Sequence, residues 1–128
     1  MATDQIYLGN PNLKKANTAH EFTEEQVIEF IKCKKDPVYF ANNYIKIVSL
    51  DEGLTQFHPY DFQEKLIRRF HENRFNICKM PRQTGKSTTS VSYLLHYAVF
   101  NDSTNIGILA NKAATARDLL SRLQIAYE

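Results

Sequence analysis

Apolar and polar residues alternate with helical spacing over five stretches of this 128-residue chain. The pattern predicts helices at residues 23–35, 36–45, 58–73, 89–100 and 113–128. Two short apolar runs, residues 75–79 and 105–110, lack helical spacing and predict strands that are buried on both faces. In the second half of the chain the order is therefore strand, helix, strand, helix. This order predicts a parallel sheet with a right-handed crossover.

The helix starts carry capping signals. Thr23 is predicted to cap the first helix, and Gln26 closes a capping box with it. Asp36 and Pro37 stand at the cap and first position of the second helix. The expected apolar faces, taken helix by helix, are Val27, Phe30 and Ile31; Val38, Ala41, Tyr44 and Ile45; Phe62, Leu66, Ile67 and Phe70; Val91, Leu94, Leu95, Ala98 and Val99; and Ala113, Ala116, Leu119, Leu120 and Leu123.

Residues 47–53 carry four mostly apolar positions followed by Asp51, Glu52 and Gly53. Such a stretch resembles a Walker B strand, in which the Asp holds magnesium and the Glu polarises water. The order of motifs argues against this, because a Walker B strand follows the phosphate-binding loop of its fold. We expect a turn at residues 51–53, with residues 54–57 returning as a hairpin partner.

The stretch at residues 80–88, MPRQTGKST, follows a predicted strand and opens a predicted helix. Its Gly85-Lys86-Ser87 is the end of a P-loop, in which Lys reaches the terminal phosphates and Ser ligates Mg²⁺. Unpaired N–H groups and the helix dipole suit an anion there. The usual first glycine is replaced by Met80. The alternative is an ordinary strand-to-helix turn with a solvated lysine.

The predicted fold class is α/β: N-terminal helices followed by the incomplete start of a RecA-like (ASCE) P-loop NTPase sheet. Residues 1–20 are expected to form an extended N-terminal arm. Residues 21–73 form a helical lead-in with a short hairpin and an adenine-site helix. Residues 74–128 form the first βαβα of a truncated P-loop ATPase domain.

Phe62 and Gln63 lie one helix before the P-loop. The Gln amide donates and accepts together and so matches an adenine edge, while an aromatic ring can cover the base. Phe62 also fits the apolar stripe of its own helix, so a core role stays open.

Composition is that of an ordinary globular protein, with 43% hydrophobic and 23% charged residues and a net charge of +2. This charge is too small to indicate nucleic acid, and Lys32, Lys34 and Lys35 suit a solvated helix end. We expect Cys33 and Cys78 to be reduced, packed thiols in a cytosolic protein. No membrane segment is expected, and the four histidines lack metal spacing.

After Lys86 the only acids are Asp102, Asp118 and Glu128, and none ends an apolar strand. A working ATPase of this class needs such a carboxylate. The sequence therefore favours a truncated chain whose catalytic carboxylate lies elsewhere.

RQTGKS at residues 82–87 resembles the deviant Walker A of phage large terminase subunits, the ATP-driven motors that pack DNA into proheads. Four more stretches resemble the family as found in contractile-tailed phages, in the same order: PNLKKAN at 11–17, DPVYFANNY at 36–44, YDFQ at 60–63 and GILANK at 107–112. The resemblance covers residues 8–128.

The resemblance implies the ATP-binding N-terminal part of such a motor, acting in the host cytoplasm. Lys86 and Arg82 would be catalytic, with Arg82 acting in cis on the γ-phosphate, and Ser87 would ligate Mg²⁺. ATP would be bound by Phe62, Gln63, Arg82, Gln83, Thr84, Gly85, Lys86, Ser87 and Thr88. Implied partners are double-stranded viral DNA, the portal protein, the small terminase subunit and the remainder of the large subunit, without a membrane.

Two alternatives stay open. A superfamily-two helicase or other DNA translocase shares the glutamine-containing adenine site and the P-loop, but usually has a Gly- or Ser-rich entry where this chain has Arg82-Gln83. A stand-alone nucleotide-binding module would bind ATP without hydrolysis.

Overall fold

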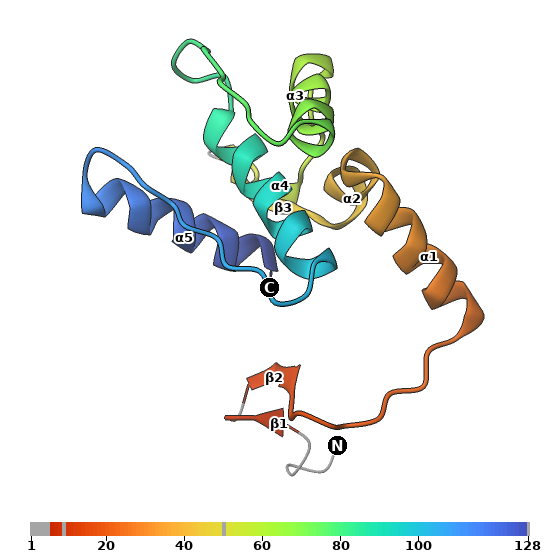
Figure 1. The fold of residues 1–128 in the computed structure, drawn as a ribbon. Helices are drawn as coiled ribbons and strands as arrows, with labels where there is room; N and C mark the ends of the chain where they lie inside the picture. Colours follow the sequence, from red (N-terminus) through yellow and green to blue (C-terminus); the bar gives the residue numbers. More distant parts are fainter. Residues whose placement is uncertain (1–5, 9, 50, 128) are drawn as a thin grey trace.

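The structure, a computed structural model, describes residues 6–8, 10–49 and 51–127 (Figure 1). It is a mixed α/β arrangement of five helices and two antiparallel hairpins within these residues. The elements are β1 (Ile6–Tyr7), β2 (Asn10–Lys14), α1 (Glu24–Lys35), α2 (Pro37–Tyr44), β3 (Lys46–Ser49), β4 (Gly53–Gln56), α3 (Asp61–Glu72), α4 (Lys86–Phe100) and α5 (Ala113–Tyr127). No helix in the described part is long and apolar enough to cross a membrane.

The predicted helix starts of α1 and α2 are confirmed. The Thr23 side chain accepts the Gln26 N–H, and the Gln26 side chain accepts the Thr23 N–H, which completes the capping box. The Asp36 carboxylate accepts the N–H groups of Val38 and Tyr39 at 2.9 and 3.2 Å, with Pro37 at the first helical position. These local bonds satisfy donors that a helix cannot pair internally.

The hairpin predicted around residues 47–57 is also confirmed. Strands β3 and β4 pair antiparallel, with Ile47 opposite Thr55 and Ser49 opposite Gly53. Asp51 and Glu52 lie exposed in the turn, and Gly53 has a φ of 71°. The acidic pair therefore belongs to a turn, as the order of motifs indicated. Leu50, the last apolar position of that pattern, lies outside the described residues.

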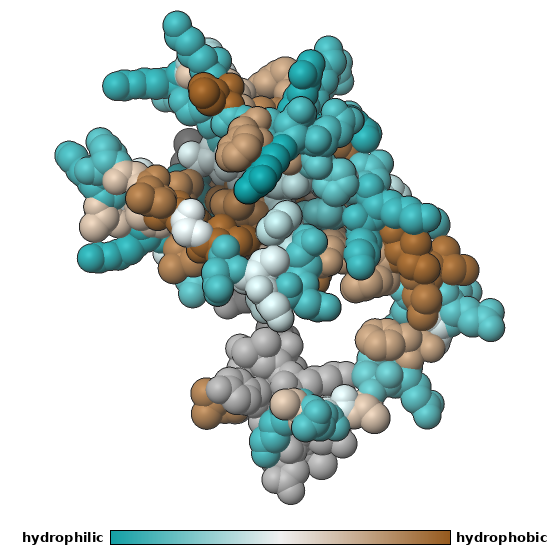
Figure 2. All heavy atoms as spheres, in the orientation of Figure 1, coloured by the Kyte–Doolittle hydropathy of each residue, from teal (hydrophilic) through white to brown (hydrophobic). Residues whose placement is uncertain are grey.

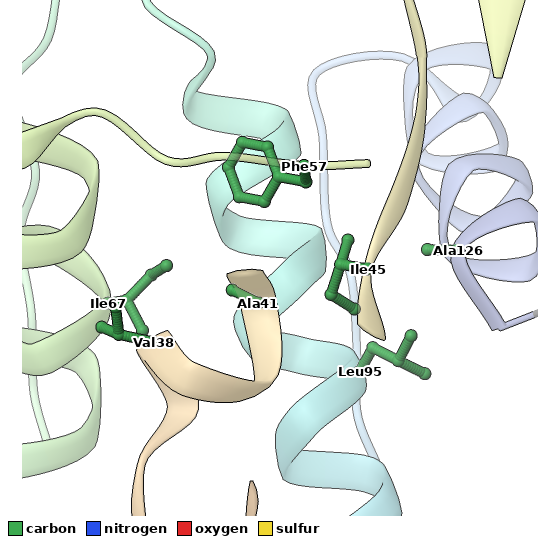
Figure 3. Packing of buried hydrophobic residues seen from close by; sticks show 7 residues of the cluster. All are labelled: Val38, Ala41, Ile45, Phe57, Ile67, Leu95 and Ala126. Carbon is green, nitrogen blue, oxygen red and sulfur yellow. The ribbon is translucent and has the colours of Figure 1, made fainter. Parts of the chain in front are cut away.

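The core forms where α2, α3 and α4 meet beside β3 and β4, with the end of α5 closing one side (Figures 1 and 3). Ile67 from α3 and Ala41 from α2 are fully buried, and Leu95 from α4 is 4% exposed. Figure 3 shows the side chains of Val38 and Ile67 next to each other, and Ile45 near Leu95 and Ala126. Residues from the second half of the chain thus complete a core that α2 begins.

The structure does not show the two predicted parallel strands. Residues 75–79 and 105–110 form no strand, and no parallel pairing exists among the described residues. Phe75 is 82% exposed, Ile77 is fully exposed and Leu109 is 93% exposed. A strand needs a neighbour for its N–H and C=O groups, and the two segments do not pair with each other.

Several predicted side-chain positions are also wrong. On α4, Val91 and Leu95 are buried as predicted, but Ala98 and Val99 are exposed. The buried face also carries Ser92 and His96, which were not predicted. Phe62 is 46% exposed although it was placed on the buried stripe of α3. Cys78, predicted to be packed, is exposed with its extended segment, whereas Cys33 is buried as expected.

On α1, the predicted apolar face is wrong as well: Val27, Phe30 and Ile31 are all exposed, and the buried residue is Cys33. The N-terminal arm contains a β1–β2 hairpin, in place of the fully extended chain expected over residues 1–20, and its first five residues lie outside the described part. Figure 1 shows this hairpin apart from the helices, joined to α1 by an extended segment.

Candidate nucleotide-binding site

The loop at residues 80–85 turns sharply into α4. Gly85 occupies the N-cap of α4 with φ 70° and ψ 21°, a left-handed conformation that glycine adopts at little cost. Gln83 is also left-handed, with φ 60°, whereas Thr84 between them is not. Turns of mixed hand point successive N–H groups into one concavity that suits an anion. The strain at Gln83, a non-glycine residue, marks the loop as a functional candidate.

The loop is closed by hydrogen bonds from its own residues. Lys86 Nζ donates to the carbonyl oxygens of Met80 at 3.3 Å and Pro81 at 3.2 Å. Thr84 Oγ1 donates to the Pro81 carbonyl at 3.0 Å. The ammonium group is thus held at the loop while the Lys86 side chain stays exposed. The two carbonyl partners could not be predicted from the sequence, because every residue type carries a backbone carbonyl.

Gln63 joins α3 to this loop. Its Nε2 donates to the Thr84 carbonyl at 3.2 Å, and its Oε1 accepts the Tyr60 N–H at 2.9 Å. The Gln63 residue is 3% exposed. A Cβ added at Gly85 would collide with the Gln63 amide nitrogen. Only glycine therefore allows the loop and the Gln63 amide to approach so closely.

Phe62 lies at the start of α3 with its ring stacked on Tyr60, at a centroid distance of 5.9 Å and an interplanar angle of 10°. Both rings are open, at 46% and 71% exposure. Tyr60 was not among the predicted site residues. Its position two residues before Phe62, at the N-cap, is the signal that could have indicated it. The structure therefore places an exposed aromatic pair directly beside Gln63 in the chain.

The segment around the loop is uniformly basic. Between Glu72 and Asp102 the chain has no acid, and its four cationic side chains are Arg74, Lys79, Arg82 and Lys86. None of the ion pairs between described residues involves Arg82 or Lys86. Positive charge without compensating carboxylates favours an anionic ligand over a cationic one.

Metal binding by protein side chains alone is not indicated. The described residues include no group of three or more His, Cys, Asp or Glu side chains that could hold a metal ion. Ser87, exposed in the first turn of α4, offers one hydroxyl. Mg²⁺ takes few protein ligands when phosphates supply oxygens, so this hydroxyl fits an ion that arrives with a polyphosphate.

Thr88 and Thr89 have different surroundings from Ser87. The buried Thr89 hydroxyl donates to the Gly85 carbonyl at 2.8 Å and is occupied within the helix. The half-buried Thr88 lines a pocket of about 490 Å³ between β3, α4 and α5. The structure thus gathers residues 82–88 at one end of α4, with Gln63 bound to them and Phe62 beside Gln63.

The shifted pKa values lie elsewhere, where α1, α2 and α4 meet. Tyr39 and Tyr44 donate to Glu29 Oε1 at 2.8 and 2.9 Å, which lowers the pKa of Glu29 and raises that of Tyr44 to about 12. Burial lowers the pKa of His96, whose Nε2 lies 2.9 Å from the Cys33 carbonyl. These contacts hold helices together, and neither Glu29 nor His96 was singled out from sequence.

A scan against known protein families gives no match to this chain.

Proposed function

We propose that residues 80–88 bind the phosphates of Mg·ATP, in the N-terminal part of an ATP-driven DNA-packaging motor of the large terminase type. The observation that carries the proposal is the loop itself. Left-handed residues at Gln83 and Gly85 enter an uncapped helix N-terminus, with Lys86 Nζ held over the loop carbonyls. Such a loop offers N–H donors and a mobile cation to a polyphosphate.

Each loop residue has a separate role in the proposal. On binding, the Lys86 ammonium exchanges its two carbonyl partners, at 3.2 and 3.3 Å, for phosphate oxygens, which carry full negative charge. Ser87 would supply one oxygen ligand to a Mg²⁺ ion that arrives with the nucleotide, and the ion would supply positive charge beside the phosphates. The exposed Arg82 guanidinium, planar and always charged, reaches the γ-phosphate from the same chain. Gln83, Thr84 and Thr88 contribute backbone groups around the phosphates.

The base of the nucleotide is proposed to lie against the start of α3. Phe62 and Tyr60 offer exposed ring faces for stacking, while Gln63 has already committed one donor and one acceptor to Thr84 and Tyr60. Gln63 is therefore expected to act on the nucleotide in two ways. Its amide can still form hydrogen bonds to the base with its second N–H and its second oxygen lone pair, and it also fixes the loop. The sequence predicted only the contact with the base.

We further propose that residues 75–79 and 105–110 become the first two strands of a parallel P-loop sheet when the remainder of the large subunit adds strands beside them. Support comes from their exposed apolar side chains, Phe75, Ile77 and Leu109, which flank α4 on both sides in the chain. Sheets of this type bury both faces. In that assembly the partners are viral DNA, the portal protein and the small terminase subunit, in the host cytoplasm.

The 128-residue chain is expected to bind Mg·ATP without hydrolysing it. After Lys86 the acids are Asp102, Asp118 and Glu128, none of which ends an apolar strand, and hydrolysis needs a carboxylate that positions the attacking water. Phosphate release should stay at the buffer rate. Turnover that disappears in Lys86→Ala would contradict this part of the proposal and leave binding intact.

The test is calorimetric titration of the chain with Mg·ATP. Lys86→Ala should weaken binding at least tenfold, because about 1.4 kcal/mol or more of charge-assisted bonding is lost. Lys79→Ala is the matched control: it removes an exposed cation from the same basic segment but outside the loop, and should change the dissociation constant less than twofold.

Equal losses of affinity in the two variants would mean that Mg·ATP is held by the general positive charge of the segment and not by the loop. Unchanged binding in Lys86→Ala would remove Lys86 from the site. Full binding of the wild-type chain to adenosine without phosphates would place the nucleotide elsewhere on the surface.

A further inference from the structure

Helix α1 has apolar residues on two sides. Its inner side carries Cys33, the one buried residue of the helix. Its outer side carries Val27, Ile28 and Ile31, which are 45%, 54% and 45% exposed. Positions i, i+1 and i+4 lie together on a helix surface, so these three side chains form one outer patch. Figure 2 shows hydrophobic atoms gathered over α1 at the edge of the molecule.

The rotation of α1 about its axis is fixed by contacts on the inner side. Glu29 Oε1 accepts hydrogen bonds from the Tyr39 and Tyr44 hydroxyls of α2. The Cys33 carbonyl accepts from His96 Nε2 of α4 at 2.9 Å. A glutamate thus faces the body of the molecule while three branched apolar side chains face away. The outer patch therefore cannot turn inward without breaking these bonds.

The charges of α1 are segregated along its length. Glu24 and Glu25 lie in the first turn, and Lys32, Lys34 and Lys35 in the last. Of these, only Lys32 has an ion pair among the described residues, with Glu29. An acidic end, an apolar middle and a basic end make a surface complementary to itself when two copies run antiparallel.

We propose that the outer face of α1 pairs with the same face of a second copy of this chain, antiparallel and about a two-fold axis. An axis between Ile28 and Ile31 brings Ile28 of each copy opposite Ile31 of the other. It also brings Glu24 opposite Lys35 at both ends.

The expected association is weak. The helix has 12 residues and is about 18 Å long, which makes a smaller contact than a standard interface. A dissociation constant on the order of 10–100 µM is expected. An acidic or a basic partner would match only one end of α1, whereas a second copy matches both.

The first test is sedimentation equilibrium of the 128-residue chain across this concentration range. Ile28→Glu places a carboxylate at the centre of the contact and should raise the dissociation constant at least tenfold. Leu120→Glu, on α5 and also 50% exposed, is the matched control and should leave the constant unchanged. Ile77→Lys serves as a second control, for association through the exposed segment 75–79.

A charge exchange then tests the antiparallel direction. Glu24→Lys and Lys35→Glu should each weaken self-association about threefold at low salt, since like charges then meet at both ends. A mixture of the two variants restores attraction at both ends and should associate as wild type does. Circular dichroism checks that α1 stays helical in each variant.

A wild-type chain that is monomeric at 200 µM overturns the proposal. So does a dimer that Ile77→Lys abolishes while Ile28→Glu leaves it intact, and so does a mixture of charge variants that fails to associate. Binding of Mg·ATP should be the same in Ile28→Glu and wild type, so the nucleotide-binding proposal stands or falls separately.

Discussion

Two regions of this molecule both carry large apolar side chains but have opposite environments. Helices α2, α3 and α4 bury Ala41, Ile67 and Leu95 in one core (Figure 3). The segments on either side of α4 leave Ile77 and Leu109 almost wholly exposed. A helix pairs its backbone internally and needs only a surface to pack on. A strand needs a neighbour for every second backbone group, and neither segment has one among the described residues.

The candidate site lies at the boundary between the packed helices and an exposed segment. The loop at residues 80–85 leaves an unpaired segment and enters α4, which has more buried residues than any other described helix. The α4 side of the loop is fixed by Gly85 and by Gln63 of α3. Within the described part of the chain, the bonds that fix the other side are those of Lys86 and Thr84 to Met80 and Pro81.

The largest expected effect contrasts a core isoleucine with an exposed one. Ile67→Ala should lower the free energy of unfolding by about 3 kcal/mol, because Ile67 is fully buried and a cavity remains. Ile77→Ala should change it by less than about 0.5 kcal/mol. Urea denaturation followed by circular dichroism measures both. Ile67→Val, which removes one methylene, should cost about 1 kcal/mol. Equal costs at positions 67 and 77 would mean that segment 75–79 packs in solution.

A smaller effect tests the boundary at Gly85. Gly85→Ala should lower the free energy of unfolding by about 2–3 kcal/mol. The backbone at Gly85 is left-handed, which alanine adopts at a cost, and the added Cβ would displace the buried Gln63 amide. Gly53→Ala is the control: its φ is 71°, but nothing lies within 4 Å of the added Cβ, so only the backbone cost of about 1 kcal/mol applies. If the two costs are the same, Gln63 does not hold the loop.

The sequence predicts the structure correctly where the interactions that determine it are local. The caps at Thr23 and Asp36 and the turn before Gly53 depend on residues at most four positions apart, and all three are confirmed. It failed for residues 75–79, since an apolar run does not say whether a neighbouring strand exists. It also missed the inward rotation of Glu29, because two tyrosines of another helix decide it.

For the candidate site, the residue types around Lys86 and Gln63 were predicted, and the structure brings residues 82–88 and Gln63 together. The bond between the Gln63 amide and the Thr84 carbonyl was not predicted, because it joins elements 21 positions apart. The left-handed backbone at Gln83 was not predicted either, because a residue other than glycine gives no indication of that conformation in the sequence.

The smallest expected effect is a pH dependence of the free energy of unfolding, which comes from the buried His96. His96 is 2% exposed, its Nε2–H donates to the Cys33 carbonyl, and its Nδ1 has no partner among the described residues. Burial lowers its pKa below the ordinary 6.5. The unfolded chain therefore takes up a proton first, and stability should fall as pH drops through 6.5 toward the folded pKa, by at most about 1.4 kcal/mol per pH unit.

His96→Gln keeps an N–H donor without titrating in this range, so the slope between pH 7 and pH 5 should decrease. The lowered pKa of Glu29 adds a separate loss, because its stabilisation is complete above the ordinary 4.5 and disappears as pH falls through its folded pKa. The two groups therefore act in different pH windows. An unchanged slope in His96→Gln would assign the neutral-pH dependence to other groups.

Whether the turn into α4 binds a triphosphate can be measured from the backbone amide chemical shifts of the 128-residue chain during titration with Mg·ATP. We expect the largest shifts on Gln83 to Thr88 and smaller ones at Tyr60 to Gln63, and we expect Lys86→Ala to remove both sets. Saturating Mg·ATP that leaves the amides of residues 83–88 unmoved, or moves others more, would contradict it.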